Sequence, residues 1–268
     1  MKLYNIILCI TKVGDTLRHA LITAGTKGLG KRVTEQLLKD GYSVTVTHRD
    51  DNDKLDAVKN EWGRHLERIQ FIRGDVTCKE DLIRISEETV KAWGRIDALV
   101  MNAGPYIFER KKLIDYSEEE WNKMLDGNLN SAFYLLKQVI PIMRKQKSGR
   151  IIAYAFQGAD HSPGWLYRSA FAAAKVGLVS LTKTIAIEEA ENGITANVIC
   201  PGKIVGEMKE ASITQSRQYG HEETPIGRSG TGEDIGRTIS FLCDENSDMI
   251  TGAVLEVTGG MDVLNRFR

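Results

Sequence analysis

Short apolar runs rich in β-branched residues alternate along the chain with longer segments of helical period, starting at His19. The strand-like runs are HALITAG, SVTVTH, IQFIRGDV, IDALVMNAG, RIIAYAF, ITANVICPG and AVLEVTGG. Segments such as KRVTEQLLKDG, KEDLIRISEETVKAWG and EEEWNKMLDGNLNSAFYLLKQVIPIM separate them. Strand–helix alternation is typical of parallel strands joined by right-handed crossovers. We therefore expect an α/β fold, a doubly wound parallel sheet of about seven strands with helices on both faces.

The chain shows no internal repeat and no low-complexity linker. We therefore expect residues 1–18 to be an N-terminal extension and residues 19–268 to form a single domain. Lys2 and the following LYNIILCI resemble a short signal peptide, but a small-x-small cleavage site is missing, which favours the extension. Residues 203–231 are polar and rich in glycine, and this irregular stretch predicts a long loop that serves the substrate.

Composition excludes several classes of protein. With 268 residues, 42% of them hydrophobic, the chain can bury a large core, and without a run of 18 apolar residues no membrane-spanning helix is expected. Thirty-six basic residues balance thirty-six acidic ones, so no nucleic acid or anionic membrane is expected as a partner. The four cysteines are far apart and form no CxxC pair, which predicts no disulfide framework, no metal site and a reducing, cytoplasmic setting.

A glycine-rich loop, TAGTKGLG, connects the first predicted strand to a helix at residues 23–30. Gly25 and Gly30-Lys31 have the spacing of a P-loop, but Arg32 stands where that motif needs a Ser or Thr for magnesium, so a nucleotide triphosphatase is not expected. The same glycines allow a sharp turn and let a phosphate approach the helix amides. Placed after the first strand, they predict a Rossmann-type dinucleotide-binding loop.

Taken together, several motifs resemble those of the short-chain dehydrogenases/reductases, especially the bacterial 3-oxoacyl-carrier-protein reductases. The resemblance extends from about His19 to Asp262. The matching residues are Thr23, Ala24, Gly25, Gly28 and Gly30 in the loop, Asp75-Val76, Asn102-Ala103-Gly104, Asn128 in GNLNSAF, and Pro201-Gly202. The resemblance implies an oxidoreductase that acts on CH–OH or C=O groups with a nicotinamide cofactor.

That resemblance also implies which residues hold the cofactor. Asp75 accepts a hydrogen bond from the adenine amino group, Asn102-Ala103-Gly104 ends the fourth strand beside the cofactor, and the backbone of Ile204 faces the carboxamide. The expected cofactor-binding residues are Thr23, Gly25, Lys27, Gly28, Leu29, Gly30, Arg49, Asp75, Val76, Asn102, Ala103, Gly104, Lys175, Pro201, Gly202 and Ile204.

Two basic residues bear on the choice between NAD and NADP. Arg49 follows directly after the second strand, where NAD enzymes place a carboxylate, and Lys27 stands at a second position that the family associates with NADP. Both charges can face the 2′-phosphate of NADP. Asp50 and Asp51 leave a ribose contact of NAD open as the alternative. We favour NADP(H).

The catalytic positions depart from the family. There a tyrosine donates a proton to the carbonyl oxygen, a lysine four residues later lowers the pKa of that tyrosine and binds the nicotinamide ribose, and an asparagine connects a water to the lysine. Lys175 and Asn128 match the lysine and asparagine, but Phe171 replaces the tyrosine. Phe156 occupies the position of the serine that binds the carbonyl oxygen, and the segment 156–171 is two residues longer than usual.

Other hydroxyl groups could take over the missing role. Tyr167 lies four residues before Phe171 and eight before Lys175, so the three share a face if the helix extends that far. One helical turn displaces its hydroxyl by about 5.4 Å, which favours a packing role for its ring. Ser162 and Ser169 are further alternatives, although Ser169 would point away from the lysine.

The substrate side is only partly conventional. The family pattern Pro-Gly-x-Ile-x-Thr ends in Gly206 here, so the threonine hydroxyl is missing. Of two basic positions that dock carrier protein in the family, one matches Lys147 and the other is Asn192, which argues against a carrier-bound substrate. Trp165, Tyr106, Phe108 and Met208 can line an apolar pocket for a small molecule.

Two functions remain open. The first is an NADP(H)-dependent oxidoreductase with a weakened proton donor, and the second is a cofactor-binding sensor or subunit that has given up catalysis. Loss of a general acid costs about 10²–10⁴-fold in rate without preventing the reaction, so we favour the enzyme. The helices expected at residues 121–143 and 170–189 carry apolar residues around more than one side, which predicts a homodimer or homotetramer.

Overall fold

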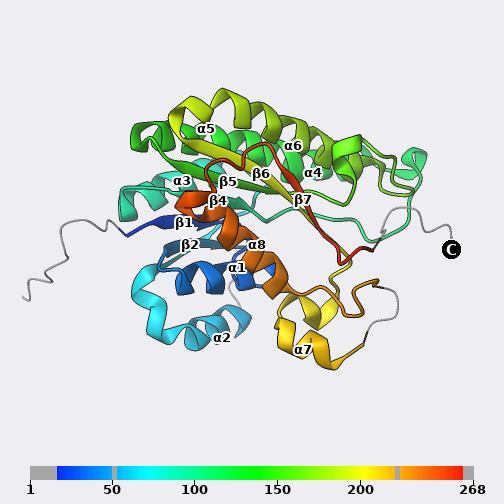
Figure 1. Ribbon diagram of the computed structural model, residues 1–268. Coiled ribbons are helices and arrows are strands. Elements are labelled where there is room, and N and C mark those ends of the chain that lie inside the picture. Colours follow the sequence, from blue (N-terminus) through cyan, green and yellow to red (C-terminus); the bar gives the residue numbers. More distant parts are fainter. Residues whose placement is uncertain (1–16, 50–52, 221–223, 262–268) are drawn as a thin grey trace, which may run out of the picture.

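The structure, a computed structural model, describes residues 17–49, 53–220 and 224–261. Its centre is one sheet of seven parallel strands in the order β3-β2-β1-β4-β5-β6-β7 (Figure 1). This confirms the predicted doubly wound sheet. The strands are β1 (His19–Ile22), β2 (Ser43–His48), β3 (Ile69–Arg73), β4 (Ala98–Met101), β5 (Gly149–Tyr154), β6 (Ile194–Pro201) and β7 (Val254–Val257).

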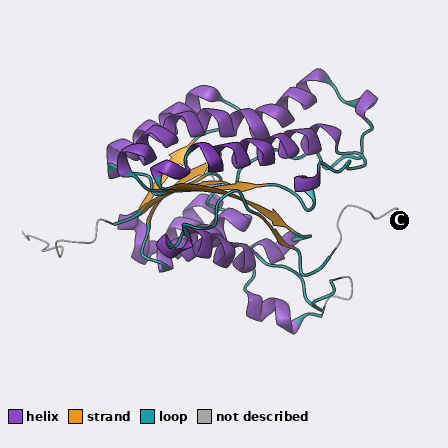
Figure 2. Ribbon diagram, turned by 45° about the horizontal axis from the view of Figure 1, so that its top comes forward, coloured by secondary structure: helices purple, strands orange, loops and turns teal. Residues whose placement is uncertain are grey.

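Helices cover both faces of the sheet, giving three layers (Figures 1 and 2). The α3, α5 and α6 helices pack on one face, where Leu82, Leu135 and Leu178 join a single apolar cluster. The α1, α2 and α8 helices pack on the other face through Val33, Val58 and Ile235. Their bounds are α1 (Gly28–Lys39), α2 (Asp53–Glu61), α3 (Lys79–Trp93), α4 (Glu118–Leu125), α5 (Ser131–Gln146), α6 (Ser169–Glu188), α7 (Ile213–Gln218) and α8 (Gly232–Cys243).

Burial explains why the strands lack simple polar–apolar alternation. Every residue of β1, β2, β4 and β5 is buried, because helices cover the sheet on both sides. Full burial of a large apolar side chain contributes about 1.5–3 kcal/mol to the free energy of folding. The central strands therefore form a stiff platform, and the loops at their carboxyl ends are free to vary.

The strand order places a crevice at one edge of this platform. β1 pairs with β2 on one side and with β4 on the other. Successive strands are therefore added outward from β1 in one direction up to β3, and in the opposite direction from β4 onward. In open α/β sheets, ligands bind at the carboxyl ends of the strands on either side of this change. The loops that follow β1, β2, β4, β5 and β6 carry most of the residues that the sequence singled out.

Two predicted segments differ in detail. The helical run at 118–143 is interrupted by a π-helical turn at Asp126–Asn130 between α4 and α5. Gly127 explains the local packing, because a Cβ there would lie 2.2 Å from Pro105 Cδ. The irregular stretch 203–231 contains a 3-10 turn at Gly206–Lys209 and the short α7 helix, whose N-terminus is closed by a capping box of Ser212 and Gln215.

By length and composition alone, α6 could cross a membrane, but half of its apolar window is buried within the fold. It packs against the sheet as a core helix. The expected N-terminal extension lies outside the described residues except for Leu17 and Arg18, and Asp50 and Asp51 lie outside them as well. Cys78, Cys200 and Cys243 are free thiols, and the reducing setting remains a prediction.

Candidate active site

The glycine-rich loop turns sharply between β1 and α1. Ala24 and Gly28 both have positive φ angles, of 52° and 59°, and α1 begins at Gly28. Thr23 fixes the start of the turn, because its buried hydroxyl accepts a hydrogen bond from the Ala103 amide at 2.9 Å. The Asn102 amide group donates to the carbonyls of Thr23 and Ala24 at 3.1 and 3.2 Å. The loop after β4 thus holds the loop after β1.

Three glycines of this region lie where a larger residue would not fit. A Cβ at Gly30 would lie 2.2 Å from the Ala24 carbonyl oxygen, and one at Gly25 would lie 2.6 Å from Val46 Cγ1. A Cβ at Gly104 would lie 2.3 Å from the Asn128 side-chain oxygen. Gly25 and Gly30 permit the close packing of turn, strand and helix that dinucleotide-binding loops require.

A carboxylate marks an anion position at the start of α1. Glu210 accepts a hydrogen bond from the Gly28 amide at 2.7 Å and contacts the Lys31 ammonium at 3.5 Å. The amino end of a helix attracts negative charge through its exposed amides and its dipole. The Glu210 oxygens stand in for the oxygens of a phosphate, so the residues present fit the diphosphate of a dinucleotide.

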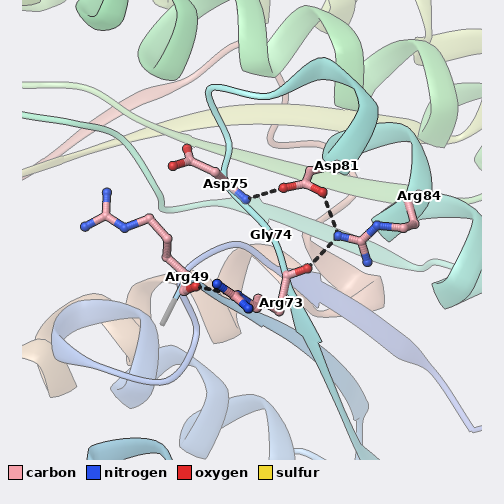
Figure 3. A pocket seen from close by; sticks show the side chains of 6 residues that line it. All are labelled: Arg49, Arg73, Gly74, Asp75, Asp81 and Arg84. Atoms are coloured by element: carbon pink, nitrogen blue, oxygen red, sulfur yellow. Dashed lines mark hydrogen bonds and ion pairs between the residues drawn. The ribbon is translucent and has the colours of Figure 1, made fainter. Parts of the chain in front are cut away.

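A basic pocket of about 590 Å³ opens beyond the carboxyl ends of β2 and β3 (Figure 3). Its lining residues are Arg49, Arg73, Gly74, Asp75, Asp81 and Arg84. The sequence had singled out Arg49 and Asp75 but not Arg73 or Arg84. The β2–β3 register, which pairs His48 with Arg73, brings Arg73 next to Arg49, and Arg84 reaches them from α3. Lys27 is exposed at the N-cap of α1 and is not part of this lining.

Hydrogen bonds fix the walls of this pocket (Figure 3). Arg73 donates to the Arg49 carbonyl at 3.1 Å, and Arg84 donates to the Arg73 carbonyl and to Asp81, both at 2.7 Å. The Asp81 carboxylate also accepts from the Asp75 amide at 2.8 Å. Hydrogen bonds from Arg84 and from that amide lower the pKa of Asp81, which keeps its carboxylate charged. The pocket is therefore pre-shaped before any ligand enters.

Lys175 is buried in α6 with only 5% of its surface exposed. Its Nζ lies 5.7 Å from the centre of the Phe171 ring and, among the described residues, forms no hydrogen bond. Burial lowers the pKa of Lys175 to about 8. A buried ammonium without polar partners is costly, and such a group is suited to bind ribose hydroxyls.

Aromatic rings occupy the positions where the family has hydroxyl groups. Phe156, after β5, lies 6.3 Å from Phe171 between ring centres, so the structure brings the two substituted positions together. Trp165 packs against both rings at 4.8 and 6.0 Å, and Tyr106 contacts Phe171 edge to face at 4.9 Å. The site therefore has a largely apolar aromatic wall next to Lys175.

Asn128 sits in the π-helical turn and is nearly fully buried. Its amide group donates to the carbonyls of Pro105 and Met124, both at 3.0 Å, whereas its side-chain oxygen has no partner among the residues that the structure describes. A buried, unpaired acceptor is expected to find a hydrogen-bond donor, such as a water or a ligand. The expected link to Lys175 through a water remains a prediction.

Tyr167 does not share a helix face with Phe171 and Lys175. The α6 helix begins only at Ser169, and Tyr167 has a left-handed φ angle of 64°. Its ring lies under the Arg110 guanidinium, 4.7 Å away. The condition that made Tyr167 a candidate donor is therefore not met, because the chain turns sharply before the helix starts.

The two serines that were considered as substitutes, Ser162 and Ser169, differ in exposure. Ser162 is exposed and has a left-handed φ angle of 52°. The Ser169 hydroxyl, at the first turn of α6, is buried and has no hydrogen-bond partner within the described part of the chain.

Four other residues were expected to contact the cofactor, namely Val76, Ile204, Gly202 and Leu29. Val76 packs against the apolar cluster on the face covered by α3, α5 and α6, and Ile204 is buried in the cluster on the face covered by α1, α2 and α8. Gly202 donates to the Val257 carbonyl, and a Cβ there would lie 2.9 Å from Thr258 Cα. Leu29 packs partly buried against the same core as Ile204. Throughout the described ranges, no group of three or more His, Cys, Asp or Glu side chains could hold a metal ion.

Comparison with known proteins identifies the family. The family model described as enoyl-(acyl carrier protein) reductase, of the short-chain dehydrogenase/reductase type, matches residues 23–262. The chain is a short-chain dehydrogenase/reductase. This confirms the resemblance that the glycine loop and the later motifs indicated.

Relatives of this short-chain dehydrogenase/reductase cover nearly its whole length. YtkK of Bacillus subtilis (strain 168), provisionally named an oxidoreductase, is 65% identical over 251 residues, which are 93% of this chain and 98% of YtkK. The 3-oxoacyl-[acyl-carrier-protein] reductase FabG of Staphylococcus epidermidis is 34% identical over 245 residues, or 91% of this chain and 98% of that one. A solved structure from Bacillus thuringiensis, provisionally described as a 3-oxoacyl-reductase, superposes on this chain with a TM-score of 0.89. Its sequence is 64% identical, and the match covers 93% of this chain and 100% of that chain.

The family settles the reaction class. The chain is an oxidoreductase that acts on C=O or CH–OH groups and is related to the 3-oxoacyl-carrier-protein reductases. Of the two functions left open by the sequence, the family supports the enzyme.

Proposed function

We propose that this protein reduces the carbonyl group of a small molecule with NADPH. The observation that carries the proposal is the pocket beyond β2 and β3, which is lined by three arginines, Arg49, Arg73 and Arg84, and by two carboxylates, Asp75 and Asp81. A 2′-phosphate is the part of NADPH that NADH lacks, and it needs positive charge at this place. Guanidinium groups bind phosphate through paired, charge-assisted hydrogen bonds.

The remaining residues fit the rest of a dinucleotide. The amide of Gly28 at the start of α1, which Glu210 now contacts, is suited to the diphosphate. Asp75 lines the pocket and can accept from the adenine amino group. Lys175 can donate to the nicotinamide ribose, and Ile204 lies at the start of the segment that would cover the carboxamide. When bound, the reduced cofactor supplies the hydride.

The aromatic wall favours an apolar substrate. Phe156, Trp165 and Phe171 lie next to Lys175, so the carbonyl group would sit against rings. A family hydroxyl is missing at both Phe156 and Phe171, and the proton must come from another group. Lys147 bonds Asn192 at 3.2 Å, which leaves a single basic residue where the family uses two for carrier protein. We therefore favour a free small ketone over a carrier-bound one.

Binding of NADPH and NADH tests the cofactor assignment. Removing a hydrogen bond to a charged group costs about 1.5–3 kcal/mol, so Arg49→Asp should weaken NADPH binding about 10–150-fold and leave NADH binding less affected. Arg64→Asp makes the same charge change at an exposed residue outside the pocket and should change neither affinity. A wild-type protein that binds both cofactors equally, or NADH more tightly, contradicts the assignment.

Exposed apolar side chains favour the predicted homodimer or homotetramer. Phe133 on α5 is 49% exposed and Ile187 on α6 is 80% exposed, although both helices bury their opposite sides in the core. Large exposed apolar residues on neighbouring helices are typical of subunit interfaces. Sedimentation that shows only monomer at micromolar concentration contradicts this assembly.

A further inference from the structure

The proposed reduction needs a proton as well as a hydride, and the ring of Phe171 has no hydroxyl to supply one. The described aromatic rings packed against Phe171 belong to Tyr106, Trp165 and Phe156, at 4.9, 6.0 and 6.3 Å between centres. Of these three neighbours, only Tyr106 carries an O–H group that can donate a proton. Its ring centre is the nearest of the three to that of Phe171, the residue at the family's donor position.

The Tyr106 hydroxyl is held by a charged partner. The Arg168 Nε donates a hydrogen bond of 2.6 Å to this oxygen. A guanidinium has five donor hydrogens and no acceptor, so the direction of this bond is fixed. The phenol proton of Tyr106 is therefore left to bond another acceptor.

Arg168 itself is held by three backbone carbonyls. Its guanidinium donates to the carbonyls of Glu109 at 2.8 Å, Tyr167 at 2.9 Å and Phe108 at 3.1 Å. It thereby ties the loop after β4 to the turn before α6. The left-handed backbone of Tyr167 turns its carbonyl toward Arg168, which gives this strained residue a physical role. With four of its five donor hydrogens bonded, the guanidinium keeps one orientation toward Tyr106.

We propose that Tyr106 is the proton donor of this enzyme and that Arg168 is the residue that positions its hydroxyl. This inference rests on the proposed carbonyl reduction. Tyr106 transfers its phenol proton to the carbonyl oxygen as that oxygen takes up the electron pair of the C=O π bond, displaced by the incoming hydride. The tyrosine O–H bond breaks, an alcohol O–H bond forms, and water reprotonates the phenolate.

The arrangement divides the two tasks of the family lysine between two residues. Lys175 lies next to Phe171, 5.7 Å from its ring centre, and stays available for the nicotinamide ribose. Arg168 holds the hydroxyl of the donor through the hydrogen bond from its Nε. The Tyr106–Arg168 pair thus replaces the tyrosine–lysine pair without restoring the tyrosine at position 171.

The variant Tyr106→Phe removes only the hydroxyl and tests the donor directly. Loss of a general acid should lower kcat for a small ketone about 10²–10⁴-fold while NADPH binding stays unchanged. Tyr134→Phe removes a hydroxyl from α5, away from Phe171, and should leave kcat unchanged. Adding Phe171→Tyr to Tyr106→Phe should restore part of the lost rate, because a donor returns at the family position.

A second readout does not depend on turnover. With oxidised cofactor and acetophenone as the probe, a hydrogen bond from Tyr106 should lower the infrared carbonyl stretching frequency of the bound ketone. Tyr106→Phe should raise this frequency, and Tyr134→Phe should not. If Tyr106→Phe fails to fold, Arg168→Gln should lower kcat without changing KM for NADPH, and Arg168→Lys should recover part of kcat by restoring the charge.

Two results would overturn the inference, and they can be told apart. A Tyr106→Phe protein with wild-type kcat and an unchanged carbonyl frequency shows that another group donates the proton, and the proposed reduction still stands. A wild-type protein that binds NADPH but reduces none of a panel of ketones contradicts the proposed function and removes the donor role with it.

Discussion

Replacing Lys175 by methionine should make the cofactor-free protein more stable. The side chain is buried in α6, and burial lowers its pKa from 10.5 to about 8. At pH 7 the amine is charged in both the folded and the unfolded chain. The folded state therefore carries the cost of a buried charge, and this shift of the pKa corresponds to about 3 kcal/mol. Methionine has a similar length and helix propensity and no charge, so Lys175→Met should gain up to about 3 kcal/mol in the free energy of unfolding.

The assay is urea unfolding of the cofactor-free protein at pH 7, together with NADPH titration. The pKa of Lys175 is depressed on folding, so the wild-type protein should also gain stability as the pH rises from about 8 toward 10.5, and Lys175→Met should lack this gain. Lys183→Met on the same helix is the matched control, because that side chain is 42% exposed and pairs with Asp160. It should change stability by at most about 0.5 kcal/mol.

Lys175→Met should at the same time bind NADPH more weakly. A gain in stability together with a loss of binding would show that Lys175 serves to bind the ligand although it destabilises the fold. A Lys175→Met protein that is less stable than wild type, or that binds NADPH unchanged, refutes the reasoning.

Three further changes have defined outcomes. Gly30→Ala should weaken NADPH binding more than tenfold, measured by fluorescence titration, because the added Cβ would lie 2.2 Å from a backbone oxygen. Gly63→Ala is the control and should not weaken binding, because a Cβ there has no described atom within 4 Å. In a Tyr106→Phe protein, Phe171→Tyr should raise the rate of ketone reduction at unchanged NADPH affinity, since it adds a proton donor beside Lys175; no rise speaks against a reductase site at this position. Burial lowers the pKa of His19 to about 3, so lowering the pH from 7 to 5 should cost about 2 kcal/mol in urea unfolding; His19→Gln should lose this dependence.

Most of the fold could be predicted because its signals are local. The β-branched runs that begin at His19 and Ser43 are buried strands, and the glycines at 25, 28 and 30 form the expected turn between β1 and α1. Lys175 was recognised from its spacing to Phe171. These features depend on neighbouring residues or on a few positions in one helix, which is the range at which sequence patterns are informative.

The missed residues depend on contacts between distant segments. Arg73 reaches the pocket of Arg49 through the register of β2 and β3, and a predicted pairing of these strands could have indicated it. No local pattern pointed to the bond between Tyr106 and Arg168, whose positions differ by 62 residues. The predicted start of α6 lies within one residue of the observed one, but the sequence did not show that Tyr167 lies outside the helix, because Tyr167 adopts a left-handed backbone that its residue type does not favour.

The transfer of deuterium from deuterated NADPH to a ketone tests the central claim most directly. The wild-type protein is mixed with a panel of small ketones and NADPH labelled on the transferred position, and the alcohol is examined by mass spectrometry. We expect an alcohol that carries one deuterium on its carbon, formed faster with NADPH than with NADH at equal concentration. An unlabelled alcohol, or no alcohol from a protein that binds NADPH tightly, would contradict carbonyl reduction at this site.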